Sequence, residues 1–368
     1  MFFTAQDVEF STELDFSDAI QIKSSRKVYD VDYTNKSLDI IVNEVYQEND
    51  LIFIDRNVYN LSPNTFTNTI SNSSNQSIIN FYIFDASEDT KTMDSVLSIT
   101  DLLYTMNFTK QNKFIVIGGG ITQDVGGFAA GLYKRGINWV YIPTTILSMT
   151  DSCIGSKVSV NRISKNILSI FNAPNKIIIS DYFLTSLSPD DIISGVGEAL
   201  KLSLIGGDVA LSFFNDKFHQ KDYISIIKMA SLVKKQIIEY DEFDQNVRNV
   251  LNYGHTIGHA IEGVSNYFIP HGIAVLIGMY IENSLCNDSK YNDINKTILN
   301  LVNPKFFDID INYSLFIKHI LSDKKNKGNN VCFILLENIG STRIVYKPID
   351  TIRDKLKEIM GSLFRCVL

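Results

Sequence analysis

FIVIGGGITQDVGGFAAG, residues 114–131, joins an apolar run, three consecutive glycines and a segment with helical spacing. The run FIVI is short, β-branched and uninterrupted, as expected for a strand buried on both faces of a sheet. The glycines let the backbone turn sharply and approach a phosphate, next to the free amides at the start of a helix. The stretch therefore predicts an α/β domain with a parallel sheet and a phosphate-binding turn.

The turn matches the Rossmann fingerprint GxGxxG only in part, because Gln123 stands where the third glycine belongs. A tight strand-to-helix turn without a ligand is the alternative interpretation. Four more short apolar runs support the α/β assignment, at 51–54, 78–84, 139–142 and 176–180. We expect a helix at about 90–106. The polar stretch 64–77 predicts a loose surface segment, with a short amphipathic helix as its alternative.

The pattern changes after residue 187. Ser188 followed by Pro189 is a typical helix start, and apolar residues then recur with helical spacing over 190–205, 221–240, 247–262 and 272–286. Residues 331–346 predict a hairpin with its turn at ENIGS, and a helix is expected at about 350–360. We therefore predict an N-terminal Rossmann-like α/β domain (1–187) and a mainly α-helical C-terminal domain (188–368).

Composition and charge argue against several classes of function. The chain has 368 residues, 45% of them hydrophobic, and a net charge of −7, which argues against a broad nucleic-acid interface. No run approaches the roughly 18 apolar residues of a membrane helix, and the N-terminus lacks the pattern of a secretory signal. The four cysteines are scattered without a CxxC pair. These features predict a cytoplasmic protein that acts on small molecules, not on nucleic acid or membranes.

Three of the five histidines fall within seventeen residues, His255, His259 and His271. His255 and His259 lie four residues apart in NYGHTIGHAIE (252–262), so a helix would place them on one face. Histidine is a common metal ligand, and this grouping favours a metal site over satisfied core histidines. Two charged stretches are less specific: SKVSVNRISKN (156–166) is typical of a solvated loop as well as of an anion site, and Glu198 with Lys201 is either a buried ion pair or part of a site.

Taken together, five blocks resemble the 3-dehydroquinate synthases and their sugar-phosphate cyclase relatives. The blocks are GGGITQDVGGFAAGLYKRG, PTTILSMTDSCIGSKVSVN, GVGEALKLSLI, NYGHTIGHAIE and PHGIAVLIGM, within a resemblance from about residue 51 to 328. The first fifty residues contribute little to it. The resemblance implies a lyase of the shikimate pathway for aromatic amino acid biosynthesis.

The family converts 3-deoxy-D-arabino-heptulosonate 7-phosphate into 3-dehydroquinate and phosphate. The implied steps are transient oxidation by NAD, β-elimination of phosphate, re-reduction, ring opening and an intramolecular aldol closure. A divalent metal, usually zinc and otherwise cobalt, polarises the reacting oxygens. The resemblance thus implies NAD, a metal, a small sugar-acid phosphate as substrate, and a homodimer.

The resemblance also assigns roles to residues on the metal and substrate side. Metal ligands are Glu198, His255 and His271, and His259 becomes a group near the substrate for hydrogen bonding or proton transfer. Positions that match catalytic and substrate-binding residues of the family are Asp151, Lys157, Asn166, Lys201, Lys234, Arg248, Asn252 and Lys325, with Lys324 as the alternative to Lys325. Arg135 matches an arginine that reaches the neighbouring subunit's site.

On the cofactor side, the implied NAD contacts lie at strand ends, in the glycine turn and in the basic loop. They are Asp55, Asn57, Glu88, Lys91, Gly119, Gly120, Asp124, Thr144, Thr145 and Lys165. An acidic residue at the ribose favours NAD over NADP, whose additional phosphate it would repel.

The chain departs from the family pattern at a few positions, namely Ser87, Gln123, Ser156 and Ile273, and none of them removes a proposed ligand. Asn252 and His259, which cyclases acting on sedoheptulose 7-phosphate tend to change, are both present. Related valiolone-type and inosose-type cyclases remain the alternative. A metal-dependent polyol or glycerol-phosphate dehydrogenase and a non-catalytic binding module are further alternatives.

Overall fold

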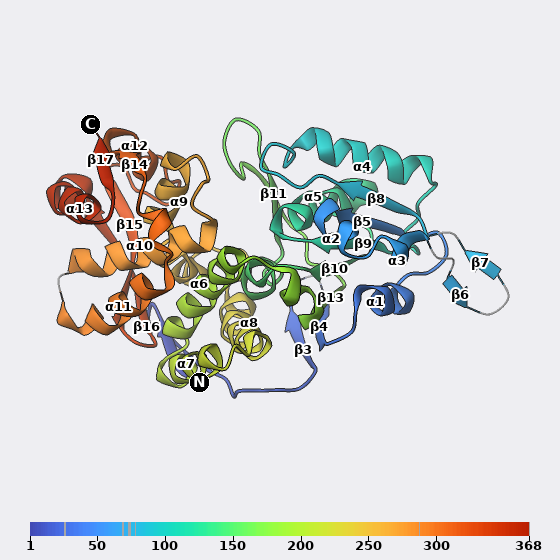
Figure 1. Ribbon diagram of the computed structural model, residues 1–368, viewed down its shortest axis with the longest axis horizontal. Coiled ribbons are helices and arrows are strands. Elements are labelled where there is room, and N and C mark those ends of the chain that lie inside the picture. Colours follow the sequence, from blue (N-terminus) through green and yellow to red (C-terminus); the bar gives the residue numbers. More distant parts are fainter. Residues whose placement is uncertain (26, 68–69, 73–74, 78, 287, 368) are drawn as a thin grey trace. The chain divides into compact units, whose positions relative to one another are not determined.

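The computed structural model describes residues 1–367 except 26, 68–69, 73–74, 78 and 287. The chain forms two compact units (Figure 1). We refer to Phe16–Leu187 as the N-terminal unit, and to Ser188–Leu368 together with Met1–Asp15 as the C-terminal unit. The chain thus divides between Leu187 and Ser188, where the sequence pattern changes. The sequence pattern places the first fifteen residues in the N-terminal domain, whereas the fold places them in the C-terminal unit.

A seven-stranded sheet is the centre of the N-terminal unit, which is α/β as predicted. Six neighbouring strands are parallel, and β3 pairs antiparallel with β4 at one edge. In spatial order the strands are β3 (Ala19–Lys23), β4 (Val28–Thr34), β13 (Lys176–Ser180), β10 (Trp139–Pro143), β9 (Phe114–Gly118), β5 (Leu51–Asp55) and β8 (Phe81–Phe84). β5, β9 and β10 are buried along their whole length, which explains their uninterrupted apolar runs.

Helix α5 (Gly120–Leu132) packs on this sheet and follows β9 directly through the glycine turn (Figure 1). Glycines at its inner face permit this close contact, since a Cβ on Gly126 would lie 2.8 Å from a methyl group of Val116. α4 (Met93–Thr105) packs against α5, and the strands β11 (Lys157–Val160) and β12 (Leu168–Phe171) form a separate hairpin. The remaining helices are α1 (Leu38–Val45), α2 (Arg56–Leu61) and α3 (Asn64–Thr67).

The polar stretch 64–77 is more ordered than predicted. It contains α3 and the short strands β6 (Ile70–Asn72) and β7 (Asn75–Ser77), while residues 68–69 and 73–74 of the predicted loose segment lie outside the described residues.

The C-terminal unit is mainly helical, as predicted. Ser188 is the N-cap of its first helix and accepts a hydrogen bond from the amide of Asp191. The helices are α6 (Pro189–Ile205), α7 (Asp208–His219), α8 (Tyr223–Tyr240), α9 (His255–Val264), α10 (His271–Cys286), α11 (Asn292–Leu301), α12 (Tyr313–Leu321) and α13 (Ile349–Leu363). Within the described residues, no helix has the length and apolar character needed to cross a membrane.

A four-stranded sheet explains why the first fifteen residues belong to the C-terminal unit. β1 (Phe2–Ala5) pairs in parallel with β16 (Ser341–Pro348), and β2 (Val8–Ser11) follows it antiparallel. β16 also forms the predicted hairpin with β15 (Asn330–Asn338), and Gly340 in the turn has φ +80. The sequence offers no sign of this pairing, because β1 and β16 lie more than 330 residues apart. A short pair, β14 (Asp310–Asn312) and β17 (Arg365–Val367), completes the unit.

The predicted continuous helix over 247–262 is wrong in its first half. Val247–Asn252 form a 3₁₀ turn, and α9 begins at His255 after Gly254, whose φ of +76 is left-handed. A side chain at Gly254 would also meet the backbone of α10, because its Cβ would lie 2.6 Å from the carbonyl oxygen of Val275. The break places His255 at the first turn of a helix that packs tightly on α10.

Candidate functional site

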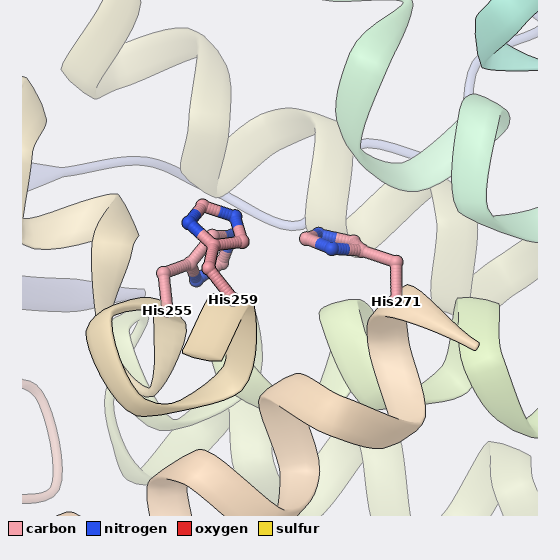
Figure 2. Close-up of side chains that lie close together, drawn as sticks. All are labelled: His255, His259 and His271. Atoms are coloured by element: carbon pink, nitrogen blue, oxygen red, sulfur yellow. The ribbon is translucent and has the colours of Figure 1, made fainter. Parts of the chain in front are cut away.

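Three imidazole rings meet in the C-terminal unit. His255 and His259 lie one turn apart on α9, and His271 is the first residue of α10 (Figure 2). One ring nitrogen from each residue lies within 4.8 Å of the other two. Ring centroids are 5.3 to 5.5 Å apart for each of the three pairs. This spacing is suitable for nitrogen ligands around one cation.

Glu198 brings a carboxylate to the same place from the middle of α6. Its Oε1 lies 3.5 Å from Nε2 of His255 and 3.4 Å from Nε2 of His271. Its Oε2 forms an ion pair with Lys201, and both side chains are fully buried. Glu198, His255 and His271, the predicted ligand set, therefore lie together, and Lys201 compensates part of the carboxylate charge.

Close helix packing makes this convergence possible. A Cβ on Gly272 would lie 1.7 Å from the carbonyl oxygen of Ser194, so only glycine allows α10 to start against α6. Ser194 also accepts a hydrogen bond from the amide of Gly272 through its hydroxyl, at 3.0 Å. The segments that carry Glu198 and His271 are thereby fixed against each other.

The imidazoles of His255 and His271 each have a partner for the second nitrogen. Glu262 Oε2 lies 3.0 Å from Nδ1 of His271, and the carbonyl oxygen of Tyr253 lies 3.2 Å from Nδ1 of His255. Such contacts fix the orientation of a metal-binding ring and direct its other nitrogen toward the metal. Glu262 was not predicted, although NYGHTIGHAIE contains it three residues after His259, on the same helix face.

The electrostatics of the cluster suit a cation. Burial disfavours a charged ring, but the carboxylates of Glu262 and Glu198 outweigh it and raise the pKa of His271 to about 10. A proton on His271 therefore neutralises carboxylate charge, and a divalent cation bound there would replace that proton. Desolvation and the two neighbouring imidazoles instead lower the pKa of His259 well below its ordinary value, so this ring stays neutral.

His259 differs from the other two rings in exposure as well. Its side chain is 46% exposed, against 9% for His255 and 24% for His271. Its Nε2 lies 4.0 Å from Glu262, beyond hydrogen-bond distance. A neutral, accessible imidazole beside a cation pocket can accept a proton from a bound substrate.

The other predicted residues of the C-terminal unit differ in burial. Lys234 on α8 and Arg248 in the 3₁₀ turn are buried, and Arg248 donates hydrogen bonds to the backbone of Glu242 and from its own amide to Asp241. Asn252 donates to the carbonyl oxygen of Asn249 at 3.0 Å.

Lys325 is half-buried and pairs with Asp323 at 3.0 Å, and its charge helps to lower the pKa of His259. Lys324, the alternative, is exposed. The structure therefore favours Lys325 as the lysine near the histidine cluster.

In the N-terminal unit, the glycine turn leaves room beside the start of α5. A Cβ on Gly118 would lie 2.6 Å from the Thr122 hydroxyl, so internal packing already requires this glycine. At Gly119 and Gly120, in contrast, the nearest atoms would lie at 3.5 Å (Thr145) and 3.6 Å (Ser152). The protein alone does not need glycine at these two positions. Space for a phosphate against the free amides of a helix start is a sufficient physical reason for it.

Five predicted residues of this unit form one polar network. Lys91 pairs with Asp124 at 2.5 Å and donates to Asn166 at 2.6 Å, and Lys165 lies 3.3 Å from Glu88. Asn161 links the two halves, because its amide nitrogen donates to Glu88 and its amide oxygen accepts from the backbone amide of Asn166. Asn161 was not predicted, although it lies inside the basic loop singled out in the sequence.

The remaining predicted residues lie elsewhere in this unit. Asp55 is the N-cap of α2 and accepts from the amide of Asn57 at 2.7 Å, and burial raises its pKa. Thr144 and Thr145 follow β10, and Asp151 lies in a π-helical turn, Ser148–Ser152. Lys157, at the start of β11, and Arg135, after α5, are exposed.

Comparisons with known proteins identify the family of this chain. The family model for the N-terminal part of 3-dehydroquinate synthase matches residues 81–194, and the model for the C-terminal part matches residues 195–326. The chain belongs to the 3-dehydroquinate synthase family. A relative from Pelagibacter ubique with this name is 35% identical over 333 residues, which cover 83% of this chain and 88% of the relative.

Solved structures of two sugar-phosphate cyclases share the fold of this 3-dehydroquinate synthase family member. A 2-deoxy-scyllo-inosose synthase complexed with carbaglucose-6-phosphate, NAD+ and Co2+ superimposes with a TM-score of 0.79 at 20% identity, over 92% of this chain and 99% of that chain. The 2-epi-5-epi-valiolone synthase of Streptomyces hygroscopicus, with NAD+ and Zn2+ bound, gives 0.73 at 21% identity, over 90% and 97%.

Two departures from the family pattern have a visible structural context. Ser156 is buried and has φ +62, a left-handed backbone conformation that glycine adopts more easily than serine. Ile273 is buried in α10 and adds to the apolar core of the C-terminal unit. Neither departure displaces a histidine of the cluster.

Proposed function

We propose that the protein is a NAD- and metal-dependent carbon–oxygen lyase that converts 3-deoxy-D-arabino-heptulosonate 7-phosphate into 3-dehydroquinate and phosphate. The observation that carries the proposal is the cluster of Glu198, His255 and His271 in a member of the 3-dehydroquinate synthase family. This reaction serves the shikimate pathway and thus aromatic amino acid biosynthesis.

The cluster fits a divalent metal of the zinc type. Two imidazoles and one carboxylate are suitable ligands, and three protein ligands leave positions open for substrate oxygens. A metal bound there would polarise the oxygen atoms of the substrate that react. Glu262 and the carbonyl of Tyr253 would hold the two rings, and Lys201 would hold the carboxylate.

The glycine turn fits the pyrophosphate of NAD. Gly119 and Gly120 leave space at the start of α5, and Tyr141 fixes the turn by donating to the carbonyl oxygen of Gly118 at 3.0 Å. When bound, NAD would take up a hydride from the substrate and return it. In the polar network of the same unit, four residues are assigned to the cofactor as well, namely Glu88, Lys91, Asp124 and Lys165.

The charged residues of the C-terminal unit suit an anionic substrate. We assign Arg248 and Lys325 to phosphate and carboxylate binding, because ammonium and guanidinium groups form strong charge-assisted hydrogen bonds to both. Lys234 is assigned to the surroundings of the reacting hydroxyls. Asn252 contributes an amide to the same surroundings. His259, neutral and accessible, is assigned to proton transfer. In the N-terminal unit, Asp151, Lys157 and Asn166 are assigned to the substrate.

We further propose that the protein acts as a homodimer in the cytoplasm. Arg135 is exposed on a turn in which it and Lys134 have left-handed φ values, so its side chain is available to a second subunit. The four cysteines are scattered along the chain without a CxxC pair, as is typical of proteins from a reducing compartment.

One assay tests the reaction. The purified protein is incubated with NAD+, Zn2+ and 3-deoxy-D-arabino-heptulosonate 7-phosphate, and phosphate release is followed together with carbocycle formation. We expect stoichiometric formation of both products without net NADH. Phosphate release from sedoheptulose 7-phosphate alone would favour a valiolone-type cyclase. Net NADH from a simple polyol would favour a dehydrogenase.

A further inference from the structure

Gln123 connects two elements of the N-terminal unit through both ends of its side-chain amide. Its Nε2 donates to the carbonyl oxygen of Ser152 at 2.7 Å, and its Oε1 accepts from the Ser152 hydroxyl at 2.6 Å. Gln123 is 2% exposed and lies in the first turn of α5. Both hydrogen bonds are short and partly buried, so the start of α5 is fixed to the residue that ends the π-helical turn Ser148–Ser152.

Both ends of this connection border proposed functional groups. The backbone amide of Gln123 donates to the carbonyl oxygen of Gly119 at 3.0 Å, and the Ser152 hydroxyl would lie 3.6 Å from a Cβ on Gly120. Asp151, assigned to the substrate, immediately precedes Ser152. A shift of Ser152 would therefore move Asp151 and one wall of the glycine turn together.

The turn that carries Asp151 needs such support. Its hydrogen bond from the amide of Cys153 to the carbonyl of Ser148, at 3.0 Å, spans five residues. This π-type geometry is rare in proteins and is frequent at functional sites. The glycine that the Rossmann fingerprint places at position 123 has no side chain and would supply neither bond to Ser152.

We propose that Gln123 is a positioning residue that fixes the Asp151 turn against the glycine turn and thereby strengthens NAD binding. The inference rests on the proposed function, because it takes the ligand of the glycine turn to be NAD. Gln123 acts through Ser152 and has no assigned contact with cofactor or substrate.

The test compares variants that remove one or both hydrogen bonds. Q123M keeps the length of the side chain without its amide, S152A removes only the hydroxyl donor, and S152T restores that donor. Q111M, at an exposed position of the same unit, is the matched control. NAD+ affinity is measured by titration calorimetry, and kcat and KM are measured with the heptulosonate phosphate.

We expect Q123M to bind NAD+ on the order of tenfold more weakly, with a smaller loss in S152A and recovery in S152T. We also expect kcat to fall while KM for the sugar phosphate changes little. Zn2+ affinity, which depends on the C-terminal unit, should stay unchanged in all variants. If Q123M does not fold, the NAD+ affinities of S152A and S152T still test the inference.

Two outcomes would overturn the inference, and they differ in meaning. If the wild type binds NAD+ and Q123M and S152A bind it equally well with the same kcat, the inference alone is wrong. If the wild type binds no NAD+ at all, the cofactor assignment of the proposed function is wrong, and the inference is overturned with it.

Discussion

The histidine cluster and the glycine turn are built on different principles. The cluster consists of side chains from three helices, and its properties depend on residue type: imidazoles, carboxylates and a buried lysine. The turn consists of backbone, and its properties depend on open space, since a Cβ on Gly119 or Gly120 would lie 3.5 Å or more from the nearest neighbouring side chains among the described residues. A side-chain site is sensitive to chemical changes, whereas a backbone site is sensitive to steric ones.

The difference also concerns charge. The cluster holds excess negative charge, which raises the pKa of His271 to about 10 against the effect of burial. The glycine turn offers neutral amide donors at a helix start, which attract an anion. One site is thus suited to a cation and the other to a phosphate, and each can be tested separately because each lies within one unit.

The largest effect is expected when a ligand is removed from the cluster. Structural zinc sites bind with roughly 10–16 kcal/mol from four ligands, so one ligand contributes roughly 3–4 kcal/mol. His255→Ala should therefore weaken Zn2+ binding by about several hundredfold in a chelator competition. His259→Ala should keep metal affinity within about tenfold and lower kcat by roughly 10²–10⁴, as expected for loss of a general acid–base group.

The same pair of variants can contradict the assignment. All three histidine nitrogens lie within 4.8 Å of one another, so a ligand set of three histidines is geometrically available. Equal losses of Zn2+ affinity in the His255 and His259 variants would show that His259 is a ligand and that the proposed division of roles is wrong.

A smaller effect is expected at Glu262, which contacts the ligand His271 but is not itself assigned as a ligand. Glu262→Gln removes the charge that lies 3.0 Å from Nδ1 of His271 and retains a hydrogen-bonding amide. Loss of such a supporting carboxylate typically lowers metal affinity by roughly 10–100-fold. Zn2+ titration measures this loss of affinity, and NMR titration of the metal-free variant should show a lower pKa for His271 than in the wild type. An unchanged Zn2+ affinity would reduce Glu262 to a packing role.

The sequence predicts most of the fold, because buried parallel strands and amphipathic helices leave local patterns. The runs at 51–54, 114–117, 139–142 and 176–180 are central strands of one sheet. The pairing of β1 with β16 leaves no such pattern, since partner choice between distant strands depends on the assembled unit. The left-handed Gly254 is likewise invisible in the sequence, because the apolar spacing continues across it.

For the candidate site, residue type and spacing are sufficient to identify the histidines. They do not predict Glu262 as the partner of His271, nor Asn161 as the link between Glu88 and Asn166, since neither role follows from local sequence. In the sequence, Gln123 is only a departure from glycine. Its bonds to Ser152 join residues 29 positions apart, which only the folded unit brings together.

Gly118 and Gly119 provide a matched pair for the backbone site. Gly118→Ala places a Cβ 2.6 Å from the Thr122 hydroxyl and should cost roughly 1–3 kcal/mol of unfolding free energy. Gly119→Ala meets only Thr145 at 3.5 Å, so stability should change by less than about 0.5 kcal/mol. NAD+ binding by Gly119→Ala should weaken roughly tenfold through a lost or displaced phosphate contact. Wild-type affinity in Gly119→Ala would contradict the placement of the pyrophosphate.

The smallest effect concerns Glu282, a buried carboxylate on α10 that accepts from the amide of Gly254 at 3.1 Å. Burial raises its pKa from 4.5 to about 8. Between these values the folded state binds more protons than the unfolded state, so unfolding free energy falls as pH rises. Glu282→Gln stays neutral and keeps an acceptor for Gly254.

We therefore expect Glu282→Gln to melt a few degrees above the wild type at pH 9 and at the wild-type temperature near pH 4.5, where the native glutamate is protonated in the folded state. Thermal unfolding across this pH range measures the difference, and Glu358→Gln, at an exposed position of α13, is the control. A variant that is less stable than the wild type at pH 9 but not near pH 4.5 would mean that the charged form of Glu282 stabilises the start of α9. In that case the carboxylate of Glu282 would add to the negative charge that the side chains around His271 supply.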